Sequence, residues 1–361
     1  MGLKLFAAAA LILLSPLYSA FASSFDGITV FGDSLSDNGN AYLASAGSIP
    51  GSNYGAYSFT AGGGKTVTTQ YFSDGPNTTP VAAGAPGLWI DKLATKLGVA
   101  DPVPVLAGGS NYAVAGAQTG TANLQDVGNQ LTLFSSTHPG GPDSRALYSF
   151  WAGANDILQG NDPAKAADRI ASYITALHGA GADNFLWLNL PLLGNSPEGK
   201  SNQAALNAAS GIFDVEWASD LALLQGNGVH VAGVDMEYLF TQITANPGAY
   251  GLTNVNTAAQ GQQLSTDAGY LFWDGLHPTT AGHSLIADAA YAKLVPVATP
   301  EPASMGLALM GIFAVSGFAA RRVGKGKRYR GCLVQDLERV RVRPDRRSFR
   351  YLQFRHWLGL K

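Results

Sequence analysis

The sequence predicts an α/β domain with a parallel β-sheet that is covered by helices on both faces. Short apolar runs, typical of buried strands, alternate with longer segments whose apolar residues recur every three or four positions, typical of helices. Such alternation indicates βαβ units, which place helices on both faces of a parallel sheet. Polar residues follow directly after several of the runs, where the ends of parallel strands form a common edge. About 275 residues lie between the two unusual ends of the chain, enough for one large domain.

Five apolar runs are the predicted strands, and five amphipathic segments are the predicted helices. The strands are expected at residues 28–31, 103–106, 146–151, 185–190 and 229–234. The helices are expected at residues 89–97, 124–134, 170–177, 212–224 and 281–294. Residues 41–87 are rich in Gly, Ser, Thr and Asn and contain one short β-like run at 66–71. So long a weakly patterned connection predicts a lid or a binding loop.

Charge is distributed unevenly along the chain. Residues 23–299 contain 8 basic and 21 acidic residues, a formal balance of −13, whereas 14 of the 23 Lys and Arg residues lie at or beyond Arg321. A negative body repels polyanions, which argues against nucleic acid as a partner. The single cysteine, Cys332, also lies beyond the body, so the body forms no disulfide and depends on its core for stability.

Residues 1–22 have the layout of a secretory signal peptide. Lys4 precedes an apolar run at residues 5–14, and small residues at Ala20 and Ala22 provide a cleavage site. The run is too short for a confident membrane span. The sequence therefore predicts export, with cleavage by signal peptidase after Ala22.

Residues 299–328 have three parts, namely a Pro-containing linker, an apolar run at 305–320 and a basic cluster that begins at Arg321. This order predicts a C-terminal membrane anchor with a cytoplasmic basic end. It resembles the PEP-CTERM sorting signal of bacteria that make extracellular matrix, which implies processing by an exosortase-type protease and release to the cell surface or matrix. Residues 329–361 are rich in Arg, and we expect them to be disordered.

Ser34 is the candidate nucleophile, because it lies in the turn Gly32-Asp33-Ser34-Leu35 directly after the first predicted strand. A serine hydroxyl needs a base, and that base needs an acceptor that fixes its tautomer. His277 and Asp274 fit these roles, since a spacing of three on a tight turn lets the carboxylate face one imidazole nitrogen. The sequence therefore predicts a Ser-His-Asp triad.

Acyl transfer through a serine also needs donors for the oxyanion of the tetrahedral intermediate. The candidates are the backbone N–H groups of Ser34 and Gly116 and the side-chain amide of Asn155, since Gly116 and Asn155 also follow predicted strands. Zinc hydrolysis would need several convergent His, Asp or Glu ligands. The sequence shows no such cluster, and it predicts neither a metal nor another cofactor.

These residues resemble the four blocks of the GDSL, or SGNH, hydrolases, in order from about Ile28 to Leu294. Longer stretches resemble the lipase and acyltransferase branch of that family, and they are FGDSLSDNGN, YFSDG (71–75), NLPLLGNSP (189–197), NPGAYG (246–251) and FWDGLHPT (272–279). The resemblance assigns residues 23–298 to one hydrolase domain. It implies a three-layer α/β/α, flavodoxin-like fold with a five-stranded parallel sheet, and catalytic roles for Ser34, Gly116, Asn155, Asp274 and His277. Ala258 stands where many plant relatives have a cysteine, so a loop disulfide known there is absent.

The leading hypothesis is a secreted serine esterase or lipase that cleaves lipid, short-chain or acetylated-sugar esters through an acyl-enzyme. Two alternatives stay open. The same site could transfer the acyl group to an alcohol or lipid acceptor. A protein with this fold could also bind matrix or polysaccharide without catalysis, because the chain carries an export signal and a surface rich in Gly, Ser and Thr.

Overall fold

The computed structural model describes residues 25–60, 64–74, 87–262 and 269–295. The predicted signal peptide, the predicted anchor region and the tail at 329–361 lie outside the described residues. The chain divides into two units after Val297, and every described residue belongs to the first. Within the described ranges, no helix is long and apolar enough to cross a membrane.

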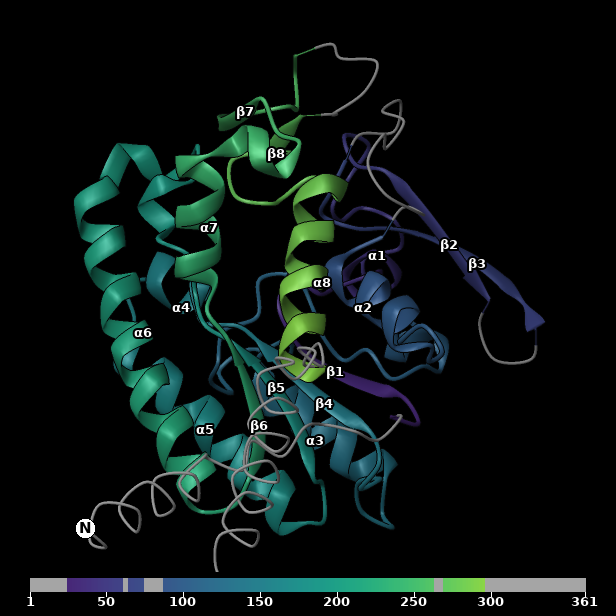
Figure 1. Ribbon diagram of the computed structural model, residues 1–361. Helices are drawn as coiled ribbons and strands as arrows, with labels where there is room; N and C mark the ends of the chain where they lie inside the picture. Colours follow the sequence, from purple (N-terminus) through teal and green to yellow (C-terminus); the bar gives the residue numbers. More distant parts are fainter. Residues whose placement is uncertain (1–24, 61–63, 75–86, 263–268, 296–361) are drawn as a thin grey trace, which may run out of the picture. The chain divides into compact units, whose positions relative to one another are not determined.

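A parallel sheet forms the centre of the domain, which confirms the predicted α/β class. Its four strands are β1 (Ile28–Gly32), β4 (Leu147–Trp151), β5 (Asn184–Leu188) and β6 (His230–Val234), in that order across the sheet (Figure 1). All residues of β1 and β4 are buried. Burial on both faces explains why these strands read as continuous apolar runs without alternation.

The predicted strand at 103–106 is wrong, and another segment takes its place beside β1. Residues 105–107 form a short 3₁₀ helix, η2 (Val105–Ala107), because Pro102 and Pro104 remove two of the N–H donors that a strand needs. Further along the chain, Tyr112 N donates to Val30 O at 2.8 Å, and Val30 N donates to Ser110 O at 3.0 Å. This parallel contact is an isolated bridge at Asn111, so the regular sheet has four strands rather than five.

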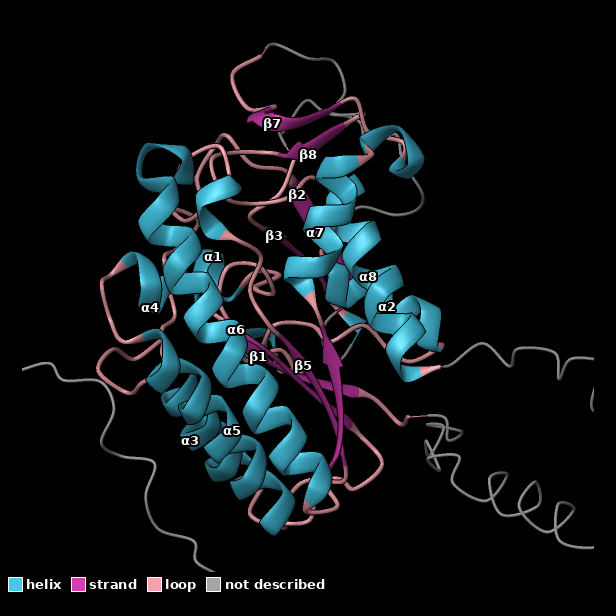
Figure 2. Ribbon diagram, turned by 60° about the vertical axis from the view of Figure 1, so that its left-hand side comes forward, coloured by secondary structure: helices cyan, strands magenta, loops and turns pink. Residues whose placement is uncertain are grey.

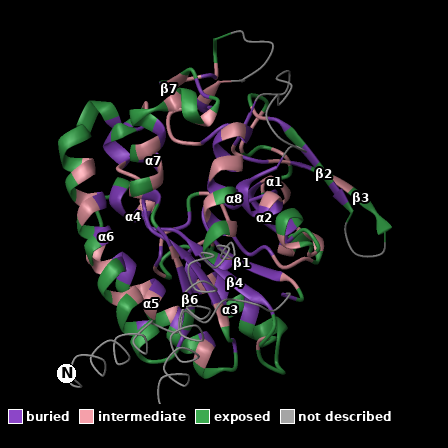
Figure 3. Cartoon of the chain, in the orientation of Figure 1, coloured by how far each residue is buried: buried purple, intermediate pink, exposed green. Residues whose placement is uncertain are grey.

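Helices cover both faces of the sheet. On one face, α2 (Trp89–Leu97) packs against α8 (Thr280–Leu294). The strands lie between this pair and the group α3 (Val127–Thr137), α5 (Pro163–Gly179) and α6 (Gln203–Gly226), as Figure 2 shows. The helix surfaces that face the sheet are buried and the outer surfaces are exposed (Figure 3). The predicted helices at 89–97, 170–177, 212–224 and 281–294 are therefore present.

The predicted helix at 124–134 begins three residues later than its apolar spacing indicates. Leu124 is 94% exposed, and α3 starts at Val127. The Asp126 carboxylate accepts hydrogen bonds from the backbone N–H groups of Asn123 and Gln118. These bonds fold the preceding residues into a turn, so Leu124 cannot join the buried face of the helix.

The remaining described elements lie mostly near the carboxyl ends of the parallel strands. They are α1 (Asn40–Ala44), α4 (Ala154–Leu158), α7 (Met236–Ala245), β7 (Asn254–Ala258), β8 (Tyr270–Phe272), η3 (Leu193–Asn195), η4 (Gly199–Asn202) and η5 (Pro247–Tyr250). The weakly patterned connection 41–87 contains an antiparallel hairpin of β2 (Ala56–Thr60) and β3 (Thr66–Gln70), which projects from the domain beside α1 and α2 (Figure 1). The predicted β-like run at 66–71 is therefore a strand.

Candidate active site

Ser34 lies in a tight turn at the carboxyl end of β1. Gly32 begins this turn, and a Cβ there would come within 2.5 Å of the backbone oxygen of Trp151, so only glycine fits. The Gln130 side chain accepts from Gly32 N at 3.0 Å and donates to Gly32 O at 2.7 Å, which fixes the backbone before the serine. Ser34 itself is partly exposed, with Asp33 buried on one side.

Three side chains that the sequence predicted to act together form a continuous hydrogen-bonded chain. Ser34 Oγ lies 2.8 Å from His277 Nε2, and His277 Nδ1 lies 2.7 Å from Asp274 Oδ2. Asp274 and His277 share one turn, residues 274–278, which we call the His277 turn. Asp274 Oδ1 closes this turn by accepting from the backbone N–H groups of Leu276 and His277. The two His277 ring nitrogens thus face a hydroxyl and a carboxylate, the arrangement that a general base requires.

The electrostatics of Asp274 favour its ionised form. Burial alone would raise the pKa of this carboxyl, but the hydrogen bonds and charge of His277, helped by the Tyr54 hydroxyl, hold it well below its usual range. Asp274 therefore stays negative at any pH at which the domain would operate, and it favours the His277 tautomer that carries a proton on Nδ1.

Asn155 reaches the same place from α4, and Gly116 lies in the turn next to it. Asn155 Nδ2 donates to Ala117 O at 3.0 Å and to Asp33 Oδ2 at 3.3 Å, which links the Gly116 turn to the residue before Ser34. Gly116 has a positive φ of 77°, which suits glycine. Asn155 lines the pocket described below together with Ser34, whereas Gly116 is not among the residues of its wall.

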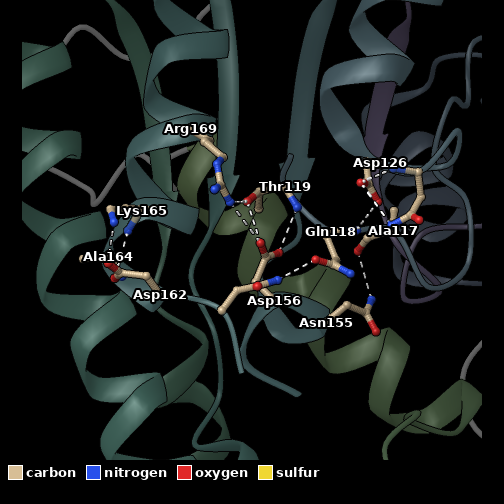
Figure 4. Close-up of polar contacts among 12 residues, drawn as sticks. Ala117, Gln118, Thr119, Asp126, Asn155, Asp156, Asp162, Ala164, Lys165 and Arg169 are labelled. Atoms are coloured by element: carbon tan, nitrogen blue, oxygen red, sulfur yellow. Dashed lines mark hydrogen bonds and ion pairs between the residues drawn. The ribbon is translucent and has the colours of Figure 1, made fainter. Parts of the chain in front are cut away.

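The residue after Asn155 anchors this turn to the helical layer (Figure 4). Asp156 is fully buried and accepts from Thr119 N at 2.8 Å and from Thr119 Oγ1 at 2.9 Å. Arg169 of α5 adds an ion pair to the same carboxylate at 3.3 Å. Asp156 thereby holds the start of α4 against residues 117–119, so Asn155 and the Gly116 turn keep a fixed relation.

A largely apolar pocket of about 840 Å³, open to solvent, adjoins Ser34 and His277. Its wall comes from the turn after β1, from α4, from residues 190–196 and from α7. The residues other than Ser34, Asn155 and His277 are Asp33, Leu35, Trp151, Ala154, Leu158, Leu190, Pro191, Leu192, Leu193, Asn195, Ser196, Glu237, Phe240, Thr241, Thr244, Phe272, Leu276 and Pro278. None of these is a Lys or an Arg, so the pocket suits an apolar group without negative charge.

Sequence reasoning missed two residues that contact the site. Asp33 is buried beside Ser34, and burial raises its pKa to about 7. Tyr54 donates its hydroxyl proton to Asp274 Oδ2 at 2.7 Å from a part of the chain that shows little pattern. The stretches YFSDG and NLPLLGNSP carried a signal, since the first lies against the His277 turn and the second forms part of the pocket wall.

Among the residues that the structure describes, one acidic group has the spacing for a cation. Carboxylate oxygens of Asp168, Glu216 and Asp220 lie within 4.8 Å of one another. The group belongs to α5 and α6, and none of its members lines the pocket.

Comparison with known proteins places the chain in a family. The model of the family described as GDSL-like Lipase/Acylhydrolase matches residues 28–290. An uncharacterised protein of Pseudomonas putida is 30% identical over 80% of this chain and 52% of its own length. The esterase EstA of Pseudomonas aeruginosa is 30% identical over 81% of this chain and 51% of its own length.

A GDSL esterase/lipase of Arabidopsis thaliana is 28% identical over 73% of this chain and 85% of its own length. The chain thus spans about half the length of the two Pseudomonas proteins and most of the length of the plant protein. The match of the family model covers both Ser34 and His277 and includes the whole described sheet. The chain therefore belongs to the GDSL-like lipase/acylhydrolase family.

Proposed function

We propose that this protein hydrolyses carboxylic esters through an acyl-enzyme on Ser34. The observation that carries the proposal is the unbroken hydrogen-bonded chain from Ser34 through His277 to Asp274 beside an apolar pocket. His277 Nε2 takes the Ser34 proton as Oγ attacks the ester carbonyl, and His277 returns this proton to the leaving alcohol. A water molecule then releases the acid by the same steps in the reverse sense.

The oxyanion is assigned to the backbone N–H groups of Ser34 and Gly116 and to the Asn155 amide. Of the two Asn155 hydrogen bonds, the 3.3 Å bond to Asp33 is longer than the 3.0 Å bond to Ala117. The hydrogen that faces Asp33 is therefore the one that turns to the oxyanion at lower cost. A single oxyanion-hole donor contributes about 10²- to 10³-fold to turnover.

The pocket supports esters with an apolar acyl group as the substrate class. Leucines at 190, 192 and 193 and Phe240 form its apolar side, and the described wall carries no cation to pair with an anionic acyl chain. We expect kcat/KM for p-nitrophenyl esters to rise as the acyl chain lengthens from acetyl, since each buried CH₂ contributes about 0.8 kcal/mol. A panel that also contains acetylated polysaccharide separates this class from acetyl-sugar esters, which would give the highest rate with acetyl groups.

The triad is tested with Ser34→Ala and His277→Ala in the full chain. Each substitution should lower kcat for a p-nitrophenyl ester by about 10³-fold or more, because the nucleophile or its base is lost. His230→Ala is the matched control, since His230 is an exposed histidine at the start of β6. Wild-type turnover in both triad variants would exclude Ser34 as the nucleophile, and absence of labelling by a fluorophosphonate in the wild type would favour a non-catalytic binding protein.

Transfer to an acceptor alcohol uses the same acyl-enzyme. Product analysis with an added alcohol distinguishes the two outcomes, because transfer yields a new ester while the rate of release of p-nitrophenol stays the same or rises.

We also propose that the domain acts after export. Residues 1–22 and 299–328 support this proposal through their sequence patterns alone. Fractionation of bacterial cells that produce the full chain or a chain without residues 1–22 tests it. The full chain should reach the periplasm or cell surface, whereas the shortened chain should stay in the cytoplasm; equal distribution of the two would reject the export signal.

A further inference from the structure

The chain between α1 and α2 contacts the His277 turn from outside the central sheet. We call its described residues 51–60 and 64–74 the hairpin arm. The Phe72 ring lies 4.9 Å from the His277 ring, centroid to centroid, and Ser73 Oγ donates to Pro278 O at 2.9 Å. Asp74 accepts from Thr280 N at 2.8 Å and also from the Thr280 hydroxyl. The hairpin arm is therefore attached to the segment that carries the base at several points.

Tyr54 makes the contact of the hairpin arm that reaches the charged pair itself. Its hydroxyl donates to Asp274 Oδ2 at 2.7 Å, the same oxygen and the same distance as for His277 Nδ1. Oδ1 of this carboxylate accepts from two backbone N–H groups. Asp274 thus has two donors on each oxygen, and Tyr54 supplies the only one of the four that comes from outside the turn.

Tyr54 is itself held in place by the rest of the hairpin arm. Its ring packs at 5.5 Å from the Phe72 ring, and its backbone oxygen accepts from Gln70 Nε2 at 3.2 Å. The next residue, Gly55, donates to Asp74 O at 2.9 Å. The phenol therefore approaches Asp274 from a fixed backbone.

We propose that Tyr54 is a positioning residue of this site, which holds Asp274 Oδ2 against His277 Nδ1 through its phenol hydrogen bond. The proposal deepens the proposed ester hydrolysis and rests on it for its kinetic part. Without the hydroxyl, Oδ2 keeps His277 Nδ1 as its single donor, and Oδ1 stays bonded to its two backbone N–H groups, so the carboxylate stays beside the imidazole but is held less firmly. The hydroxyl also offsets part of the carboxylate charge that His277 faces.

The direction in which Tyr54→Phe changes the pKa of His277 follows from this carboxylate charge. A carboxylate that loses a hydrogen-bond donor carries more uncompensated negative charge, and this charge stabilises the imidazolium form of its neighbour. The pKa of His277 should therefore rise in Tyr54→Phe. The acidic limb of kcat/KM then moves to higher pH, because more of the base is already protonated there.

Other titratable groups lie near these residues, and their titration has to be separated from the effect of the Tyr54 hydroxyl on His277. Asp33 and His283 interact electrostatically with His277, and Glu198 interacts with Tyr54. Burial raises the pKa of Asp33 to about 7, so an activity profile combines the titration of Asp33 with that of His277. A signal from the imidazole itself is needed.

The experiment is an NMR titration of the full chain labelled with ¹⁵N-histidine, in which the His277 signals are assigned by their loss in His277→Gln. In Tyr54→Phe the pKa of His277 should rise by about 0.5 units or more, a modest share of what a nearby charge can cause. Tyr57→Phe is the matched control, because it removes a phenol oxygen from β2 of the same arm, where the ring packs against Phe59 and Tyr71. The control should titrate as the wild type does.

Kinetics give the second readout. In Tyr54→Phe, kcat for a p-nitrophenyl ester should fall about tenfold, as expected for a lost hydrogen bond to a charged group, with KM changed less than about twofold. An unchanged His277 titration in Tyr54→Phe overturns the proposal, as does an equal shift in Tyr57→Phe. The titration uses no substrate, so full activity in Ser34→Ala would reject the hydrolytic mechanism while leaving the positioning of Asp274 separately decided.

Discussion

Several carboxyl groups of this domain are buried where water cannot stabilise their charge. Burial raises the pKa of Asp33 and of Asp91 to about 7, and it raises that of Asp214 to about 8. Asp91 accepts from the Asn38 side chain and from Leu88 N, whereas Asp214 Oδ1 accepts from Leu190 N beside the pocket. The sequence shows these residues only as three aspartates among many, because burial is a property of the folded chain.

A pH dependence of stability follows from Asp214. The folded-state pKa lies above the unfolded value, so the contribution to stability is full below about pH 4 and is lost as the pH rises towards about 8. Asp214→Asn removes this dependence. Between pH 5 and pH 8, the unfolding free energy of the wild type should fall by at least about 1.4 kcal/mol more than that of the variant, the equivalent of one pKa unit.

Urea denaturation at the two pH values measures this difference. Asp162→Asn is a suitable control, since Asp162 lies at the exposed start of α5 and caps that helix. If the unfolding free energies of the wild type and of Asp214→Asn changed by the same amount between the two pH values, Asp214 would titrate normally in the folded state.

At the scale of elements, the structure agrees with the sequence for the four strands of the regular sheet. The strands β1, β4, β5 and β6 are largely apolar because helices cover both of their faces, and their sequence signal is strong. α7 was missed although Met236, Phe240 and Ile243 have helical spacing, and Asp235 caps it. Residues 110–114 were not predicted as a strand, and their parallel contact at Asn111 is made by backbone groups, which every sequence supplies.

The turn before α4 depends on one glycine. Gly153 has φ of 122°, and a Cβ there would come within 2.5 Å of the Phe213 ring of α6. Gly153→Ala should lower the unfolding free energy by about 1–3 kcal/mol through the strained backbone. Because Asn155 follows two residues later, kcat should fall as well.

Thermal unfolding and ester hydrolysis measure these two effects. Gly179→Ala is the control, because a Cβ at this position in α5 meets nothing within 4 Å and its φ is not positive. That variant should be neutral or more stable by up to about 1 kcal/mol. A Gly153→Ala protein as stable and active as the wild type would refute the steric argument.

At the scale of the whole molecule, the net charge of the body and the charged groups of the pocket wall have the same sign. The body, residues 23–299, has a formal charge of −13, and the described wall of the pocket contains carboxylates but no Lys or Arg. The sequence alone predicted the sign of this charge and the chemistry of Ser34, His277 and Asp274. It did not show the pocket, because the wall joins residues 190–196, α4 and α7, which only the folded chain brings together.

The negative body should steer substrates. At an ionic strength of about 0.01 M, where the Debye length is about 30 Å, an ester with a cationic alcohol should show higher kcat/KM than an anionic ester of the same acyl chain. The difference should shrink at about 1 M, where the Debye length is about 3 Å. A neutral ester serves as the reference, and an anionic ester that reacts faster at low salt would contradict the expectation.

The separation of Ser34 and His277 along the chain, 243 positions, also determines when the proposed site first exists. Synthesis runs from the N-terminus at about 5–20 residues per second, so the serine precedes its base by roughly 10–50 seconds. During that interval the growing polypeptide carries a nucleophile without a partner that could remove its proton. In the proposed mechanism, ester cleavage therefore begins only after His277 has been added to the chain, and a translation product that ends before His277 stays inert without any separate inhibitor.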